Sequence, residues 1–465
     1  MLDPKSLLGI RKGSVVAPAG HGKTELIAKL TGLGGRTLVL THTHAGVHAL
    51  RARMSRLGID PRAAAIDTIA SWASRYTASF PALGRPLGRM PVGAEWGQLY
   101  TGGVNVLSAS PVRDVIAASY DRLLVDEYQD CDLVQHDLVI ALAEQLPTIV
   151  FGDHMQGIFG FRGNPSVSWE RDVFPEFPLV GTLEEPMRWK KANPLLGEWI
   201  AHVRTQLENG QVVGLADGPA IYLPCEHEYE LSPLFHELEE SHESVAAILC
   251  RRDACDQLAK SSKGAYQAIE DIACKTLQEF AAAWDQFSDT DREGLLRELV
   301  GAAMTSKKLK DDESDTAEDQ QVLGRVSAAY ARLRTTGEAM EAINVLSALR
   351  LHSRIRTFRA ELIRDTTKAL AGVADGKHTT LAQSAFATRQ RVSHMGRYLP
   401  KRTVSTPLLL KGLEFDRVSI PDAVHFNNER DQGARAKLFY VAISRARSTL
   451  VIASSSPTVG FPVPS

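Results

Sequence analysis

A short apolar run that passes directly into a loop of small residues and then into a helix is the feature that most constrains the fold. The run is Ser14–Ala17, the loop is Ala17–Thr24, and the helix is expected over Glu25–Leu30. Small residues let backbone N–H groups point at a phosphate, which the positive end of the helix dipole also attracts. In this pattern Lys23 reaches the β- and γ-phosphates and Thr24 holds Mg²⁺. The pattern predicts an α/β fold whose expected phosphate-binding residues are Gly20, His21, Gly22, Lys23 and Thr24.

Two adjacent carboxylates follow a second apolar run. Leu123–Val125 reads as a buried strand and ends directly in Asp126 and Glu127. Asp126 can bind Mg²⁺ through water, while Glu127 can orient and deprotonate an attacking water. A surface turn is the alternative, but an aliphatic run that ends abruptly in two acids favours the catalytic interpretation.

The stretch 152–163 combines a polar half with an aromatic half. It follows the apolar run 148–151 and should leave the carboxyl end of a buried strand, where open parallel sheets bind ligands. Gln156 could touch a phosphate there, and Phe159 and Phe161 offer aromatic faces to a base. Aromatic residues two positions apart are more often core than platform, so this stretch alone does not decide between the two.

Hydroxyls and rings also stand at the ends of two other expected strands, 37–40 and 63–66. Thr41 and His42 follow the first, and Thr68 follows the second. Strand ends of this kind can hold a sugar–phosphate chain, but a capped helix start explains each one equally well. From Phe80 to Ser110 the chain is rich in glycine and proline, which predicts a small irregular excursion.

The second half begins near residue 178 with an expected strand over Leu179–Leu183, and further strands follow at 220–223 and 245–250. Apolar residues then recur at helical spacing from Leu277 to Leu370, which predicts a helical insertion. Strand character returns at 404–410. We therefore expect units at 1–175, with a small insertion at about 75–117, and at 176–265, 266–385 and 386–465.

Composition limits the classes of function. The net charge is −2, so a nucleic-acid site would have to be local. The five cysteines form no Cys-x-x-Cys pair, which argues against a zinc or iron–sulfur site and against a disulfide framework. There is no N-terminal signal and no apolar run of membrane length, so we expect a cytoplasmic protein without a membrane partner.

The order of the motifs resembles that of the superfamily 1 helicases related to UvrD, Rep and PcrA. The matching segments are the phosphate loop at 20–24, Asp-Glu-x-Gln-Asp at 126–130, Gly-Asp-x-x-Gln at 152–156 with its continuation to 163, Lys-Gly-Leu-Glu-Phe-Asp at 411–416 and Tyr-Val-Ala-x-Ser-Arg-Ala at 440–446. The resemblance implies two RecA-like P-loop NTPase domains, with a helical insertion in the second. It places ATP and Mg²⁺ between them and single-stranded or tailed DNA across their top.

The resemblance also implies a role for each matching residue. Glu127 is the general base, Gln156 senses the γ-phosphate, and Glu414 contacts the ribose. Arg188 and Arg445 act as arginine fingers from the second domain. The residues implied to bind DNA are Thr41, His42, Thr68, Phe159, Phe161 and Arg162. A basic run that contains Arg389 could also guide phosphate, although a solvated surface is an equally good reading.

Several positions depart from the family pattern. No glutamine precedes the phosphate loop, Glu25 stands where an arginine usually stacks on the base, and Met187 replaces the usual stacking tyrosine. Leu408 stands where a DNA-contacting histidine is common. These departures leave open the selectivity for adenine and the ability to separate strands.

Two functions of different classes follow. The first is an ATP-dependent single-stranded-DNA translocase or helicase, 3′ to 5′ by the resemblance, acting in DNA repair or anti-phage defence. The alternative is a nucleotide-gated regulatory ATPase subunit with little unwinding of its own. It would control a partner nuclease of the OLD-family type, as in Gabija-type anti-phage systems.

Overall fold

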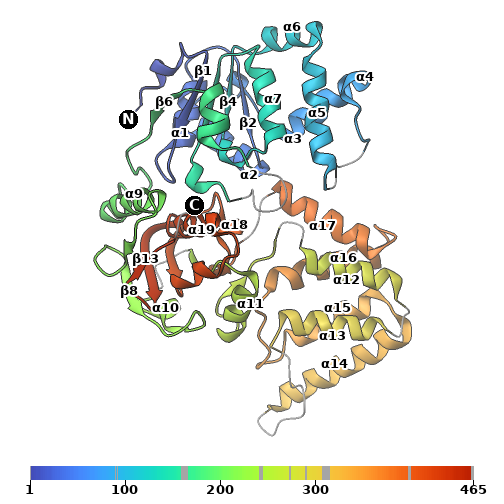
Figure 1. Ribbon diagram of the computed structural model, residues 1–465. Helices are drawn as coiled ribbons and strands as arrows, with labels where there is room; N and C mark the ends of the chain where they lie inside the picture. The colour runs from blue at the N-terminus through green and yellow to red at the C-terminus, as the bar shows by residue number, and fades with distance from the viewer. Residues whose placement is uncertain are drawn as a thin grey trace.

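The computed structural model describes residues 2–88, 91, 93–158, 166–239, 244–271, 274–287, 291–305, 315–395 and 399–461, with only the backbone described for 391–395. Phe159, Phe161 and Arg162, which the sequence predicts to bind DNA, lie outside these residues. Figure 1 shows two α/β units, one above the other, with a group of helices beside the lower unit. We call the two α/β units the first and second lobes.

The first lobe is built on a six-stranded parallel sheet with the strand order β3-β2-β4-β5-β1-β6. Every residue of β2 and β5 is buried, as expected for central strands covered on both faces by helices. The strands are β1 (Lys12–Val16), β2 (Thr37–Thr41), β3 (Ala64–Thr68), β4 (Arg122–Val125), β5 (Thr148–Gly152) and β6 (Leu179–Thr182).

The strand Leu179–Thr182 corrects one expectation, because it completes the first sheet instead of starting the second. Its residues pair with β1, and the Ser14 N–H donates to the Pro178 carbonyl over 2.9 Å. An apolar run signals a strand but does not reveal its neighbour. Here the strand β6 pairs with the edge of β1 that β5 leaves open.

The helices of the first lobe include a second correction. The glycine-rich segment expected to be irregular contains the helix α5, which packs on α3, α4 and α7. Gly102 and Gly103 are buried at these contacts, so the glycines serve close packing and do not mark a loop. The helices are α1 (Lys23–Thr31), α2 (His44–Arg56), α3 (Ile69–Ser79), α4 (Pro81–Gly84), α5 (Glu95–Leu107), α6 (Ser110–Ser119), α7 (Leu133–Ala143) and α8 (Phe174–Glu176).

The second lobe is built on another six-stranded parallel sheet, ordered β10-β11-β9-β12-β13-β8. Its strands are β8 (Ile221–Pro224), β9 (Val245–Ile248), β10 (Gln267–Ala268), β11 (Arg402–Ser405), β12 (Phe415–Ile420) and β13 (Ala446–Ser454), and β7 (Val213–Gly214) pairs antiparallel with β14 (Thr458–Val459). Its helices are α9 (Pro194–Glu208), α10 (Ser232–Phe235), α11 (Arg252–Ser261), α18 (Pro407–Leu410) and α19 (Gln432–Ile443).

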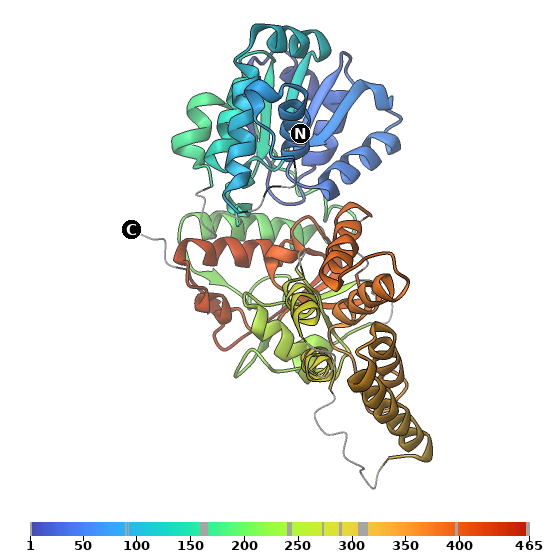
Figure 2. The same cartoon turned by 90° about the vertical axis from the view of Figure 1, so that its right-hand side faces the viewer.

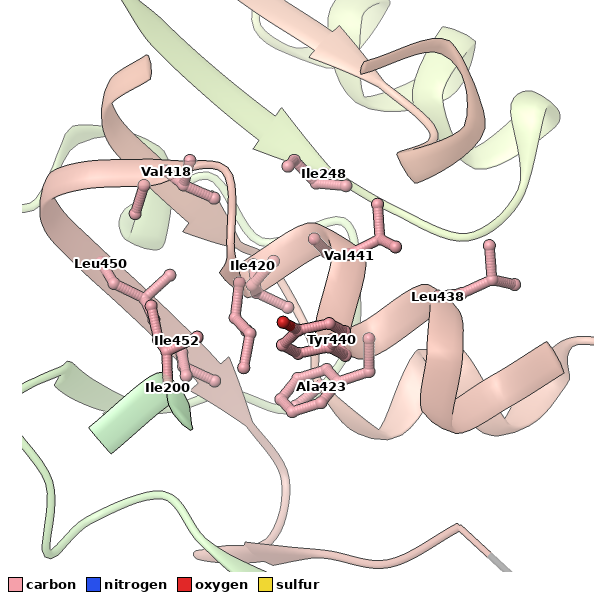
Figure 3. Close-up of a cluster of buried hydrophobic side chains, with 14 of the residues drawn as sticks. Ile200, Ile248, Val418, Ile420, Ala423, Leu438, Tyr440, Val441, Leu450 and Ile452 are labelled. Carbon is pink, nitrogen blue, oxygen red and sulfur yellow. The ribbon is translucent and has the colours of Figure 1, made fainter. Parts of the chain in front are cut away.

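Helix α19 organises the core of the second lobe. Figure 3 shows the Tyr440 ring among Ile200, Ile420 and Ile452, which come from α9, β12 and β13. Helix α19 therefore fixes its polar residues rigidly relative to the second sheet.

A helical group with its own apolar core connects β10 to the neighbouring parallel strand β11. Parallel neighbours require a crossover, and the described part of this one contains the helices α12 (Lys275–Gln286), α13 (Arg292–Ala303), α14 (Ala317–Thr336), α15 (Ala339–Leu349), α16 (Ala360–Ala374) and α17 (Leu381–Met395). Helices α14 and α15 project away from the first lobe (Figures 1 and 2). The buried Arg359 joins the group to the second lobe through Glu270, with both hydrogen bonds at 2.7 Å. Among the described residues, no helix has the length and apolar character needed to cross a membrane.

Candidate active site

The phosphate loop lies between β1 and α1, and two of its glycines adopt an unusual backbone conformation. Gly20 and Gly22 have φ values of 75° and 90°, in the left-handed region that other residues rarely adopt. An ideal Cβ on Gly20 would lie 2.8 Å from the Trp189 ring and 2.9 Å from the Arg188 Cβ. The loop therefore needs glycine both for its turn and for close packing against the segment that carries Arg188.

The N-terminus of α1 fits the phosphates of a nucleotide. Gly22 is its N-cap and supplies no side-chain hydrogen bond, so no side chain of the cap competes for the first-turn N–H groups. Thr24 follows Lys23 in this first turn and is half-buried. These donors, the ammonium of Lys23 and the carboxylate of Asp126 are a suitable set for nucleotide phosphates with Mg²⁺.

Lys23 bridges the two predicted acids at the end of β4. Its Nζ lies 2.7 Å from Asp126 Oδ1 and 2.5 Å from Glu127 Oε1. Burial alone would lower the pKa of Lys23, but the two carboxylates outweigh it and raise the pKa above its usual value. Burial would raise the pKa of Glu127, but Lys23 and Lys411 outweigh it and hold the pKa well below its usual range. Glu127 is thus kept as a carboxylate, the form that a general base requires.

The backbone at Glu127 is unusual. Its φ is 58°, so a residue with a side chain adopts the left-handed conformation directly after β4. Gln129 Nε2 donates to Glu127 Oε2 over 2.5 Å, and Gln129 Oε1 accepts from the Asp153 N–H over 3.1 Å. Strained backbone held by its surroundings is typical of functional sites. Gln129 links the acids of β4 to the turn after β5.

Gln156 lies in that turn, the 3₁₀ helix η4 (His154–Gln156). Its Nε2 donates to Asp153 Oδ2 over 3.1 Å, and its Oε1 accepts from Arg445 Nη2 over 3.5 Å. Arg445 is buried at the end of α19 and also donates to the Ser444 hydroxyl over 2.9 Å. The structure therefore brings the predicted residues Gln156 and Arg445 together from different lobes.

Arg188 and Glu414, two further predicted site residues, pair with each other. Arg188 Nη2 lies 2.8 Å from Glu414 Oε1, and Nη1 donates to the Ser444 carbonyl. The backbone N–H of Arg188 donates to the Gly20 carbonyl over 2.9 Å. Arg188 thus contacts the phosphate loop and the residue before Arg445, and its guanidinium adds to the burial that lowers the pKa of Arg445 to about 10.

Two residues of the site were not singled out from the sequence, although both lie inside recognised motifs. Lys411 Nζ lies 2.5 and 2.6 Å from the two carboxylate oxygens of Asp130, and it donates to the Gln156 carbonyl over 2.7 Å. Tyr440 accepts a hydrogen bond from the Ala19 N–H over 3.0 Å. Their place in the motifs was the available signal, but only the fold reveals their partners in the first lobe.

The remaining loop residue, His21, is buried. Its Nδ1 lies 2.8 Å from the Ala19 carbonyl, and burial lowers its pKa. His21 is therefore neutral, with a side chain that stabilises the loop, and its backbone N–H donates to the Pro18 carbonyl over 3.1 Å.

The predicted DNA-binding residues of the first lobe lie in three different environments. Thr41 is fully buried, with its hydroxyl packed toward Gly46, so this side chain is not on the surface. Thr68 caps α3 by accepting from the Ser71 N–H over 3.0 Å, which is the capping alternative. His42 is half-buried, 3.4 Å from the Cys131 Sγ, and burial with nearby lysines lowers its pKa to about 4.

Arg389, from the basic run, does not lie on a solvated surface. It is buried and donates to Glu361 Oε1 over 3.0 Å and to Asp365. Two acids from α16 therefore hold this guanidinium inside the helical group. The sequence run suggested a basic surface because these partners lie more than twenty positions away.

One family model matches a segment of the first lobe. Residues 93–167 match the family model described as the UvrD/REP helicase N-terminal domain. The match covers 75 of the 465 residues, so it shows that this segment is similar to that family. The matched segment contains Asp126, Glu127 and Gln156. No curated protein matches this sequence.

Similar solved structures include two Pif1 helicases. One is from Bacteroides, in complex with ADP-AlF3 and single-stranded DNA, with 14% identity and a TM-score of 0.31 over 56% of this chain. The other is from Candida albicans, with 14% identity and a TM-score of 0.32 over 57% of this chain. The match spans about half of those proteins, 55% of each. Both likenesses are too distant to bear on function.

Proposed function

We propose that this chain is an ATP hydrolase that moves along single-stranded DNA in the 3′ to 5′ direction and unwinds tailed duplexes. The observation that carries the proposal is the contact between the lobes at Gln156, whose amide oxygen accepts from Arg445 and whose carbonyl accepts from Lys411. The first lobe contributes Lys23 and Glu127, and the second contributes Arg445. An active site completed by two lobes ties hydrolysis to their relative movement.

Within this proposal, each group has one chemical task. The phosphate loop, with Lys23, would hold the phosphates of ATP, and Thr24 and Asp126 would hold Mg²⁺. The metal ion neutralises charge on the phosphates when bound. Glu127 accepts a proton from the attacking water. Gln156 senses the γ-phosphate, and Arg188 and Arg445 act on it as arginine fingers. Arginine side chains of this kind can raise the rate by about 10³–10⁵ when they stabilise transition-state charge.

The proposed DNA contacts begin three positions after Gln156. Phe159 and Phe161 stack on bases, which is worth about 1–3 kcal/mol per base and depends little on sequence. Arg162 binds phosphate, and His42 is a further contact, since its side chain is more exposed than those of Thr41 and Thr68. The short sequence distance from Gln156 supports coupling between the nucleotide and the DNA.

The proposal predicts that Glu127→Gln abolishes hydrolysis but leaves nucleotide binding intact. The amide keeps the shape of the side chain but cannot accept the proton from water. We would measure ATP turnover with and without single-stranded DNA, and the affinity for a fluorescent ATP analogue. Glu144→Gln is the matched control, because Glu144 is an exposed acid paired with Lys12, at the end of β1 opposite the phosphate loop. Turnover at the wild-type rate in Glu127→Gln would refute the assignment of the base.

The second candidate is a nucleotide-gated regulatory subunit that controls an OLD-family type nuclease. A specific observation favours it: Glu25, at the position expected to stack on a base, is instead held by Arg53 and Lys29 at 2.6 and 3.1 Å. Weak selectivity for the nucleotide base would suit a regulatory subunit that responds mainly to the phosphates of the nucleotide. A strand-displacement assay on tailed duplexes discriminates between the two. Robust ATP-dependent unwinding by the isolated chain would exclude a purely regulatory role and would leave DNA repair or anti-phage defence as the proposed settings.

A further inference from the structure

Helix α9 of the second lobe grips the turn that carries Gln156. Arg204 donates from Nη2 and Nε to Asp153 Oδ1 over 2.7 and 3.2 Å. One turn later, Glu208 Oε1 lies 2.5 Å from His154 Nε2, and Glu208 Oε2 accepts from Arg204 Nη1 over 2.9 Å. The two consecutive residues 153 and 154 of the first lobe are therefore held by two residues on one face of α9.

The contact between Arg204 and Asp153 determines how the Gln156 amide is oriented. Asp153 is fully buried, and its Oδ1 accepts from Arg204 and from the Met155 N–H over 3.2 Å. Its Oδ2 remains for Gln156 Nε2. Because the amide nitrogen is bound there, the amide oxygen faces Arg445. Without Arg204, the buried carboxylate would lose its counter-ion and its fixed rotamer, and the amide would lose its anchor.

We propose that Arg204 is a positioning residue for nucleotide hydrolysis: through Asp153, it sets the side chain of Gln156 against Arg445 when the two lobes are together. This inference rests on the proposed function and extends the site to α9. Arg204 itself does not touch the nucleotide. Its effect is on the rate of the chemical step and not on affinity.

The test compares Arg204→Met, Arg204→Lys, Asp153→Asn and the double variant Asp153→Asn/Arg204→Met in full-length protein. We expect Arg204→Met to lower kcat for ATP by about 10²-fold, the size expected for a misplaced group, while KM changes little. Arg204→Lys keeps the charge but not the two-point contact, so we expect it to recover part of the rate. The double variant should be no slower than the slower single variant, because both changes remove the same link.

Arg359→Met is the matched control, because it removes another buried arginine–carboxylate pair, the one that joins the helical group to the second lobe. Its turnover per folded molecule, with the folded fraction taken from thermal unfolding, should equal that of the wild type. Wild-type kcat in Arg204→Met, an effect on KM alone, or multiplying effects in the double variant would overturn the positioning role while hydrolysis by the wild type upholds the proposed function. A wild-type chain that hydrolyses no nucleotide would overturn both.

Discussion

At the scale of single residues, two neighbouring acids that face the same two lysines, Lys23 and Lys411, have pKa values shifted in opposite directions. Glu127 contacts Lys23 and stays ionised, whereas burial raises the pKa of Asp130 to about 6 although Lys411 opposes the shift. As the pH falls through about 6, Asp130 takes up a proton and Lys411 loses its charged partner. The bond between the lobes should therefore weaken in mild acid.

We predict an acidic limb near pH 6 in the pH profile of kcat for wild-type protein and its absence in Asp130→Asn, whose rate should stay low from pH 5 to 7. Stability has the opposite sign. The pKa of Asp130 in the fold lies above that of an unfolded chain, about 3.9, so ionisation opposes folding. Its contribution to the free energy of unfolding falls as the pH rises from about 4 to about 6. An unchanged acidic limb in Asp130→Asn would assign the titration to another group.

The sequence predicts those site residues that belong to a short local motif. Lys23, Asp126 and Glu127 were expected from a glycine-rich loop and from a strand that ends in acids. In the structure their side chains lie together. Lys411 and Arg204 could not be assigned partners, since the contacts that define them span 281 and 51 positions. Only the packing of the two lobes brings these residues together.

At the scale of elements, α5 was not predicted for the same reason, because the contacts of its glycines are with residues distant in the sequence. Its glycines resembled those of a loop, but a Cβ on Gly102 would collide with the Gly84 carbonyl oxygen and lie 3.1 Å from the Thr77 Cγ2. Glycine lets α5 approach the backbone of α4. Composition cannot separate a glycine that bends the chain from one that permits such a contact, and hence the helix was missed.

We predict opposite effects for two Gly→Ala changes in α5. Gly102→Ala should lower the free energy of unfolding by about 1–3 kcal/mol, because a backbone oxygen cannot yield to the added methyl group. Gly97→Ala, with nothing within 4 Å of the new Cβ, should raise it by about 0.5–1 kcal/mol through helix propensity. Urea unfolding measures both. Equal effects would mean that α5 does not pack closely on α4.

At the scale of the whole molecule, hydrogen bonds and ion pairs connect the phosphate loop and the turn that contains Gln156 to the second lobe. Tyr440 binds the Ala19 N–H, and Lys411 binds Asp130 and the Gln156 carbonyl. A ligand that binds the first lobe should therefore also stabilise the second. Linkage gives the size of the effect, about 2.7 kcal/mol for a ligand at 100 times its Kd.

We predict that a non-hydrolysable ATP analogue with Mg²⁺ slows amide hydrogen exchange in two segments, residues 17–24 and residues 441–446. Arg445→Met should keep the protection of the first segment and lose most of that of the second, because the guanidinium links α19 to Gln156. Arg297→Met, which removes an exposed pair with Glu293 on α13, should behave like the wild type. Protection confined to residues 17–24 in the wild-type protein would mean that nucleotide binding is not transmitted across the lobes, and hydrolysis would then have no route to movement along DNA.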